Sequence, residues 1–146
     1  MKKVFAIGLI LVVVVLVVLV AMVAAHEERE VGDYALELGW RVEPAYTDLF
    51  NGPEIFIEKK ASGEPVTGAD DTLKLEVSFG ADTKELKLRE VYNDPGHYTA
   101  DLIPTRPGDY TFHLTGKIGD LDVDETFTSA DGKFGTVEPI SDIRFP

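Results

Sequence analysis

Residues 109–127 read DYTFHLTGKIGDLDVDETF, and this stretch decides the fold class. Its first half alternates apolar and polar side chains, which places four apolar residues on one face: Tyr110, Phe112, Leu114 and Ile118. The dipeptide Gly119-Asp120 is a turn signal, and residues 121–127 then run back. Because alternation of this kind is typical of a half-buried strand, the stretch predicts a β-hairpin.

The same alternation continues toward the N-terminus of the domain. It predicts five further strands, which cover residues 34–42, 54–60, 72–79, 84–92 and 97–103. Turn signals such as Asn51-Gly52-Pro53 and Asn93-Asp94-Pro95-Gly96 separate them. With no helical period in this region, about seven closely spaced strands predict an all-β fold, an immunoglobulin-like antiparallel β-sandwich. In such a sandwich the hydroxyl of Tyr110 is placed to tie a corner of the chain.

The N-terminal segment has a different character. Lys2 and Lys3 precede residues 4–25, VFAIGLILVVVVLVVLVAMVAA, which contain no charge. A helix of that length is about 33 Å long and predicts a membrane-inserted leader. Two alternatives stay open: the leader is an uncut signal anchor, or it is a signal peptide cut after Ala25. In both, the lysines stay in the cytoplasm and the rest of the chain is extracytoplasmic.

The remainder is expected to divide into three parts. Residues 26–33 are rich in charge and predict a spacer, and residues 34–128 predict the sandwich. Residues 129–146 have no regular period and predict an irregular C-terminal tail that packs back on the sandwich. The apolar residues available for this packing are Phe134, Val137, Ile140, Ile143 and Phe145.

Charge and composition exclude several classes of function. The chain carries 14 basic and 26 acidic residues and no cysteine. Without residues 1–25 its net charge is −14, a balance that repels nucleic acid and anionic lipid. Both methionines lie in the leader, so the domain has no sulfur ligand for Cu(I). The sequence contains no nucleophile motif or phosphate-binding loop, and we therefore expect a protein that is not an enzyme.

Three histidines are the candidate metal ligands: His26, His97 and His113. If the leader is cut after Ala25, His26 becomes the first residue and offers its α-amine and its Nδ1 atom to one ion. A second imidazole, from His97 or His113, would complete a tetragonal Cu(II) site. The alternative interpretation is that all three are ordinary exposed imidazoles.

Several short motifs resemble the CopC/YtkA-like exported immunoglobulin-like domains that are associated with copper handling. A histidine follows the leader at Ala25-His26, and Gly63-Glu64-Pro65-Val66 leads into an alternating strand. Similar Gly-x-Tyr segments occur at Gly96-His97-Tyr98 and at Gly108-Asp109-Tyr110. The resemblance implies Cu(II) binding through the terminal histidine, a second histidine and in some members an aspartate. Only His26 matches that pattern by position.

Two functions are therefore expected from the sequence. The first is an extracytoplasmic domain that binds Cu(II) or another divalent metal for trafficking or resistance and needs no other cofactor. The second is a membrane-tethered interaction module that binds no metal. Such a module would be held by residues 4–25 and would contact an envelope protein.

Overall fold

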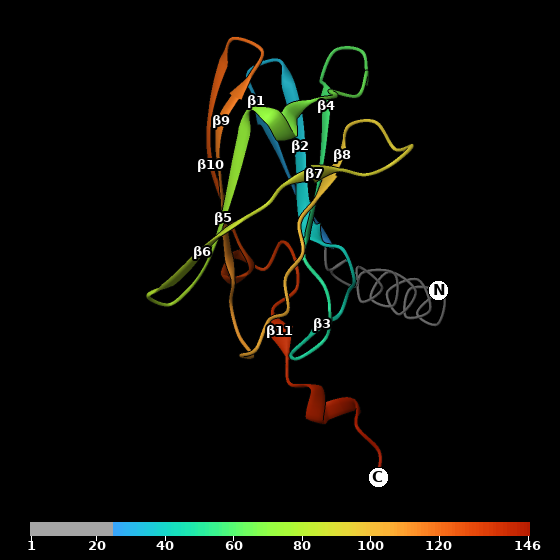
Figure 1. The fold of residues 1–146 in the computed structure, drawn as a ribbon, viewed down its shortest axis with the longest axis vertical. Coiled ribbons are helices and arrows are strands. Elements are labelled where there is room, and N and C mark those ends of the chain that lie inside the picture. The colour runs from blue at the N-terminus through green and yellow to red at the C-terminus, as the bar shows by residue number, and fades with distance from the viewer. Residues whose placement is uncertain (1–24) are drawn as a thin grey trace, which may run out of the picture.

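The computed structural model describes residues 25–146 and shows an all-β chain with antiparallel main sheets (Figure 1). The first sheet has the order β1-β2-β4-β8-β7, with strands β1 (His26–Val31), β2 (Tyr34–Trp40), β4 (Pro53–Lys59), β8 (His97–Thr99) and β7 (Arg89–Glu90). The second has the order β10-β9-β5-β6, with strands β10 (Leu121–Thr128), β9 (Thr111–Ile118), β5 (Leu73–Phe79) and β6 (Asp82–Leu86).

Short elements connect and close the two sheets. The strands β3 (Ala45–Tyr46) and β11 (Val137–Glu138) pair in parallel. Three 3₁₀ turns complete the inventory: η1 (Ala69–Asp71), η2 (Ser129–Asp131) and η3 (Ile140–Ile143). Within residues 25–146 no helix has the length and apolar character needed to cross a membrane. The membrane-inserted leader predicted for residues 4–25 lies, apart from Ala25, outside the described residues.

The hairpin predicted from residues 109–127 is confirmed. Strands β9 and β10 pair in register from Leu121 opposite Ile118 to Thr128 opposite Thr111. Alternation places Phe112 and Leu114 inside, both without solvent exposure. The Tyr110 hydroxyl donates to the Arg106 carbonyl at 3.0 Å, which is the corner tie that the sequence predicted.

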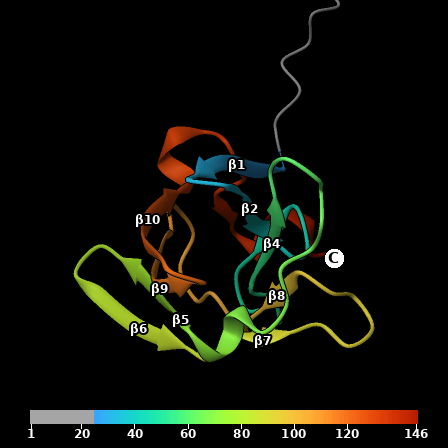
Figure 2. The same cartoon turned by 90° about the horizontal axis from the view of Figure 1, so that it is seen from above.

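Aromatic side chains hold the two sheets together in a sandwich-like arrangement. Trp40 of β2 packs on Phe112 of β9 with ring centroids 5.2 Å apart, and on Tyr110 at 5.6 Å. Trp40 is only 1% exposed, and its ring N–H donates to the carbonyl of Gly135 at 2.9 Å. Figure 2, which looks down on the molecule, shows the two sheets as separate layers around this core.

The charged spacer predicted at residues 26–33 is wrong, because these residues form β1 and the turn into β2. Glu27, Arg29 and Val31 alternate toward the interior. Ion pairs compensate the charges of Glu27 and Arg29. Glu27 is fully buried against Arg29, and the Nζ atom of Lys133 lies 3.2 Å from its carboxylate. Burial of the Arg29 guanidinium works against its charge, but Glu125 and Glu27 outweigh this effect and raise the pKa of Arg29.

Two other expectations need correction. The single strand predicted over residues 84–92 is two strands, β6 and β7, which belong to different sheets. Leu86 and Leu88 are both buried as the chain crosses from one sheet to the other. The strand predicted over residues 97–103 ends at Thr99, and beyond it an isolated bridge joins Leu102 to Asn51.

The C-terminal tail packs on the sandwich only in part. Phe134 and Val137 are each 1% exposed and belong to the core. Ile143 and Phe145 were expected to pack as well, but they are 55% and 97% exposed. After β11 the chain leaves the body of the molecule, and its last residues project from one end (Figure 1).

Candidate functional site

The first residue of β1, His26, lies over a glycine on the outer face of the first sheet. Its partner in the β1–β2 register is Gly39. A Cβ atom at Gly39 would lie 2.4 Å from Cδ2 of His26 and 2.5 Å from the carbonyl oxygen of Ala25. No real Cβ atom tolerates such contacts, so the missing side chain at Gly39 provides the space that the imidazole occupies.

The carboxylate of Glu54 lies between His26 and His97. It lies in β4 opposite Gly39 in the register, so it is two strands from His26 on the same face. Oε1 of Glu54 is 2.7 Å from Nε2 of His26. Oε2 of the same carboxylate is 3.2 Å from Nε2 of His97. One carboxylate therefore lies between two imidazoles that are far apart in the sequence.

His97 is held more firmly than His26. It is opposite Phe56 in the β4–β8 register, and the two rings stack with centroids 4.2 Å apart. Its Nδ1 lies 2.7 Å from Oδ2 of Asp94, in the turn that precedes β8. The His97 side chain is only 13% exposed, so His97 is not the ordinary exposed imidazole of the alternative interpretation.

The orientation of His97 has a chemical consequence. Asp94 accepts a hydrogen bond from Nδ1–H, which in a neutral ring leaves the lone pair of Nε2 facing Glu54. Nε2 is buried and has no hydrogen-bond partner among the described residues, although the carboxylate lies within ion-pair distance. A lone pair and a carboxylate repel each other unless a proton or another cation lies between them. The site therefore favours a cation at this point.

The carboxylates around the two rings reinforce that preference. Oε1 of Glu37 lies 3.6 Å from Nδ1 of His26, on the opposite side of the ring from Glu54. Glu37, Glu54 and Asp94 thus place three carboxylates beside two imidazoles. Carboxylate oxygens and imidazole nitrogens are the donors that Cu(II) and similar divalent ions take in proteins.

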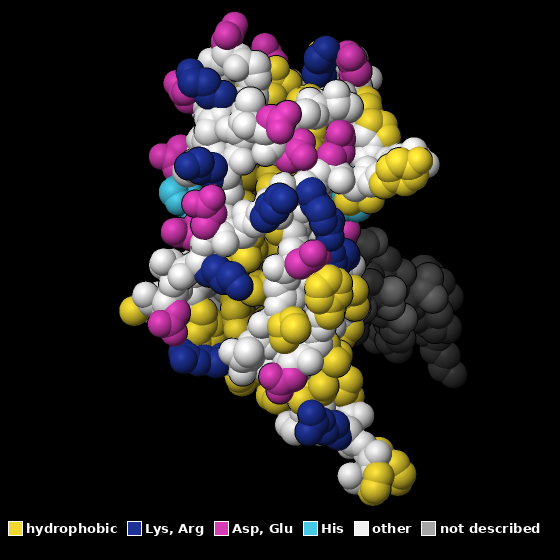
Figure 3. All heavy atoms as spheres, in the orientation of Figure 1, with side chains coloured by type: hydrophobic (Ala, Val, Ile, Leu, Met, Phe, Trp, Pro, Cys, Tyr) yellow, Lys and Arg dark blue, Asp and Glu magenta, His cyan; other side chains and the backbone are white. Residues whose placement is uncertain are grey.

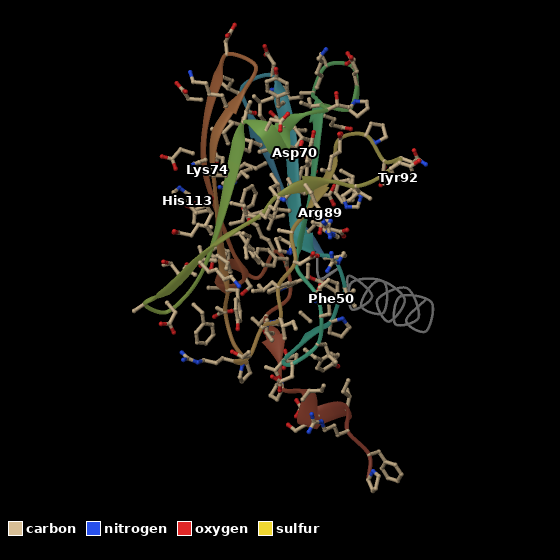
Figure 4. The ribbon with its side chains drawn as sticks, in the orientation of Figure 1. Phe50, Asp70, Lys74, Arg89, Tyr92 and His113 are labelled. Atoms are coloured by element: carbon tan, nitrogen blue, oxygen red, sulfur yellow. The ribbon has the colours of Figure 1, made fainter. Side chains whose placement is uncertain are left out.

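His113, the third candidate from the sequence, lies elsewhere. It belongs to β9 in the second sheet, and its Nε2 is 2.6 Å from Oδ1 of Asp124 on β10. The His113 side chain is 42% exposed, and Figure 4 shows it on the outer face of that sheet. The expectation that it could share one site with His26 is wrong, because the outer faces of the two sheets point in opposite directions.

The cluster does not form a ready-made metal centre. Residues 25–146 contain no group of three or more His, Cys, Asp or Glu side chains placed to hold a metal ion as they stand. Glu54, Asp94, Phe56 and Gly39 were missed in the sequence. The only sequence signal for Glu54 was its place in the alternation of EIFIEKK, where it shares the outer face with Phe56.

Comparison with known proteins gives a fold and no family. No protein-family model matches the chain, and no curated protein matches it. Its structure is similar to the crystal structure of a DUF4426 family protein from Pseudomonas aeruginosa PAO1, with a TM-score of 0.56 and 13% sequence identity. The likeness covers 71% of this chain and 92% of that one. At this identity the likeness extends to the β-sandwich-like fold and no further.

Proposed function

We propose that the chain is an extracytoplasmic, immunoglobulin-like and non-enzymatic domain that binds Cu(II) at His26, His97 and Glu54. The observation that carries the proposal is the pair of Nε2 atoms that face the two oxygens of the Glu54 carboxylate. A divalent ion between them would relieve the repulsion at His97. Small rotations of Glu54 and His26 would bring two nitrogens and one oxygen to the ion.

The chemistry of the donors favours Cu(II) over Cu(I). Two imidazoles and a carboxylate suit a tetragonal Cu(II) ion, whereas Cu(I) prefers sulfur. All the methionines lie within residues 1–25, and there is no cysteine. If the leader is cut after Ala25, the α-amine of His26 would bind the ion together with Nδ1 of its own ring, and the ring would turn so that Nδ1 in place of Nε2 faces Glu54. The role that follows is storage or delivery of oxidised copper outside the cytoplasm.

A titration with matched variants tests this proposal. Cu(II) is added to the protein and followed by calorimetry and by EPR, in which imidazole nitrogens give resolved hyperfine splitting. His97→Ala and Glu54→Gln are expected to weaken binding by about 10-fold or more, in line with loss of a ligand or its support. His113→Ala is the matched control, because it removes a histidine that also contacts a carboxylate but lies on the other sheet.

Two versions of the protein with different amino termini test whether the leader is cut after Ala25 or stays attached. One form begins at His26, and the other retains Ala25 in front of it. Tighter binding by the first form would assign the α-amine as a ligand and imply that the leader is cut. Equal affinity in both forms, with a loss in His97→Ala, would assign the site to side chains alone. Equal losses in His97→Ala and His113→Ala would contradict the proposal.

A membrane-tethered interaction module without metal is the second candidate. It is favoured by a pocket of about 220 Å³ between β6 and residues 102–106, with Val77, Phe79 and Tyr110 in its wall. Within the described residues β6 pairs only with β5, so its other edge is available to an extended segment of an envelope protein. Backbone protection of residues 82–86 in the presence of membrane extract would support this function.

A further inference from the structure

Most of the exposed large apolar side chains gather at one end of the molecule. Within residues 25–146, seven large apolar side chains are exposed, and all except Tyr92 form this group, called here the apolar pole: Val42, Leu49, Phe50, Ile103, Ile143 and Phe145. Their exposure ranges from 42% for Leu49 to 97% for Phe145. In Figure 3 hydrophobic side chains gather around the lower part of the body, toward β3 and the C-terminal segment.

Backbone and side-chain hydrogen bonds hold these residues around one loop, residues 47–51. The side chain of Asn51 bonds to both the N–H and the carbonyl of Val42, at 3.1 and 2.9 Å. The N–H of Asp48 donates to the carbonyl of Pro104 at 2.8 Å, which fixes the segment that carries Ile103. Ile140 donates to the hydroxyl of Thr47 at 3.1 Å, so the C-terminal segment starts at the same loop.

One residue of the apolar pole, Val42, lies close to the point where the described chain begins. In the β1–β2 register His26 is opposite Gly39. Because the two strands are antiparallel, the chain before His26 points toward Val42, which is three residues after Gly39. At about 3.3 Å per residue this separation is about 10 Å. The apolar run of residues 4–25 ends directly before His26, and β1 starts at His26 itself. There is therefore no linker between that run and the folded domain.

We propose that the apolar pole lies in the interfacial layer of the bilayer into which residues 4–25 insert. This inference rests on the uncut, membrane-inserted leader, one of the two forms that the proposed function allows. A domain attached without a linker stays at the bilayer surface, so Val42 and the loop of residues 47–51 that Asn51 joins to it reach the boundary of headgroups and acyl chains. The metal cluster at His26 and His97 would then lie just above the membrane.

Residue types at the pole suit a lipid interface. Arg41 lies over the ring of Phe50, 4.8 Å from its centroid, and Arg144 stands between Ile143 and Phe145 in the sequence. An arginine side chain places its apolar stem in lipid while its guanidinium stays in water, and the two phenylalanines of the pole are apolar throughout. The net charge of the domain disfavours anionic lipid, so the expected surface is zwitterionic and the contact is insensitive to salt.

Site-directed spin labelling tests the inference on the full, uncut chain. The protein has no cysteine, so single cysteines can be introduced and labelled without a background. Phe50→Cys, Ile103→Cys and Phe145→Cys probe the pole, and Lys74→Cys on the outer face of the second sheet is the matched control. Val14→Cys reports whether the leader inserts. The labelled protein is reconstituted in phosphatidylcholine vesicles, where oxygen reports lipid and a nickel chelate reports water.

The expected result is that the three pole labels collide mainly with oxygen and the label at residue 74 mainly with nickel, unchanged at 1 M salt. Pole labels in water with residue 14 in lipid would overturn this inference and leave the anchoring intact. Residue 14 in water would overturn both. Pole labels shielded from both reagents would show that a protein covers the pole, which would also overturn the inference.

Discussion

Two histidine–carboxylate contacts on opposite sheets differ in almost everything except distance. His97 lies 2.7 Å from Asp94, and His113 lies 2.6 Å from Asp124. The His97 side chain is 13% exposed, is stacked on Phe56 and faces a second carboxylate. His113 and Asp124 are 42% and 83% exposed. A short contact alone therefore does not identify a site, whereas burial and a second charged neighbour do.

The physical reason for the difference is solvent. Water screens the exposed pair and solvates each group separately, so the contact contributes little to stability. The His97 ring is largely shielded from water, whereas Asp94 is 57% exposed, and the orientation of the ring is fixed by Asp94 on one side and Phe56 on the other. An electrostatic preference at Nε2 is correspondingly stronger.

The largest expected effect separates these two histidines by stability. In metal-free protein, His97→Ala should lower the free energy of unfolding by about 3 kcal/mol, because it removes the ring stacked on Phe56 and the hydrogen bond that the ring donates to Asp94. His113→Ala should change it by less than about 0.5 kcal/mol. Urea unfolding of both variants at pH 7 measures the difference. Similar free energies of unfolding for the two variants would mean that the burial of His97 does not contribute to stability.

The inner face of the same strand gives the next prediction. Tyr98 follows His97 and is fully buried, and its hydroxyl accepts from the N–H of Ala69 at 3.1 Å. Burial is the largest cause that raises the pKa of Tyr98 to about 12; the Ala69 N–H opposes it, and Glu90 and Asp70 add to it. A raised pKa means that this group stabilises the fold fully below its unfolded pKa of about 10, and the contribution is lost toward pH 12.

That loss amounts to about 2 kcal/mol between pH 10 and pH 12. Absorbance at 295 nm should show one tyrosine that ionises last, and unfolding should become easier across the same pH range. In Tyr98→Phe both signals should disappear, so its stability should be flat where the wild type declines. A late-ionising tyrosine that persists in Tyr98→Phe would assign the behaviour to another residue.

Much of the fold could be predicted from period-2 alternation. The hairpin at residues 109–127 and the inward residues of β2, β5 and β9 follow from it, because one face of each strand packs on the other sheet. The strand at residues 26–31 was missed because its inward positions carry Glu27 and Arg29. Their burial depends on Glu125 and Lys133, about a hundred residues away, and no local pattern reports such a partner.

The candidate site could be predicted only in part. Histidine is rare enough in this chain to be noticed, so His26 and His97 were identified, but the sequence could not distinguish His97 from His113. The difference depends on which sheet each strand joins, and strand order is not a local property. Glu54 was one acid among 26, and Gly39 acts through a contact across the sheet.

A smaller effect is expected from filling the space under His26. Gly39→Ala should displace the imidazole from Glu54 and lower the free energy of unfolding by about 1 kcal/mol, the lower end of the cost of overpacking. Gly63→Ala is the control, since nothing lies within 4 Å of its Cβ position, although its φ of 68° carries a strain of its own. The NMR shifts of the two imidazoles identify the change: His26 should move, whereas His97, held by Asp94, should not.

The smallest expected effect concerns an exposed ion pair beside the site. Partial burial disfavours the charge of Asp101, but the hydrogen bond from Arg41 and the charge of Arg89 outweigh it and lower the pKa of Asp101. A lowered pKa stabilises the fold above the unfolded value of about 3.9, and that contribution is lost as the pH falls through the folded value. Because Asp101 is 49% exposed, solvent screening limits the effect. Asp101→Asn should lower the free energy of unfolding by under about 0.5 kcal/mol at pH 7 and should not change it at pH 2.

Urea unfolding of Asp101→Asn at both pH values, with and without 1 M salt, measures this difference. If Asp101→Asn lowered the free energy of unfolding at pH 7 as much as His97→Ala does, solvent exposure would not explain which charged contacts stabilise the fold.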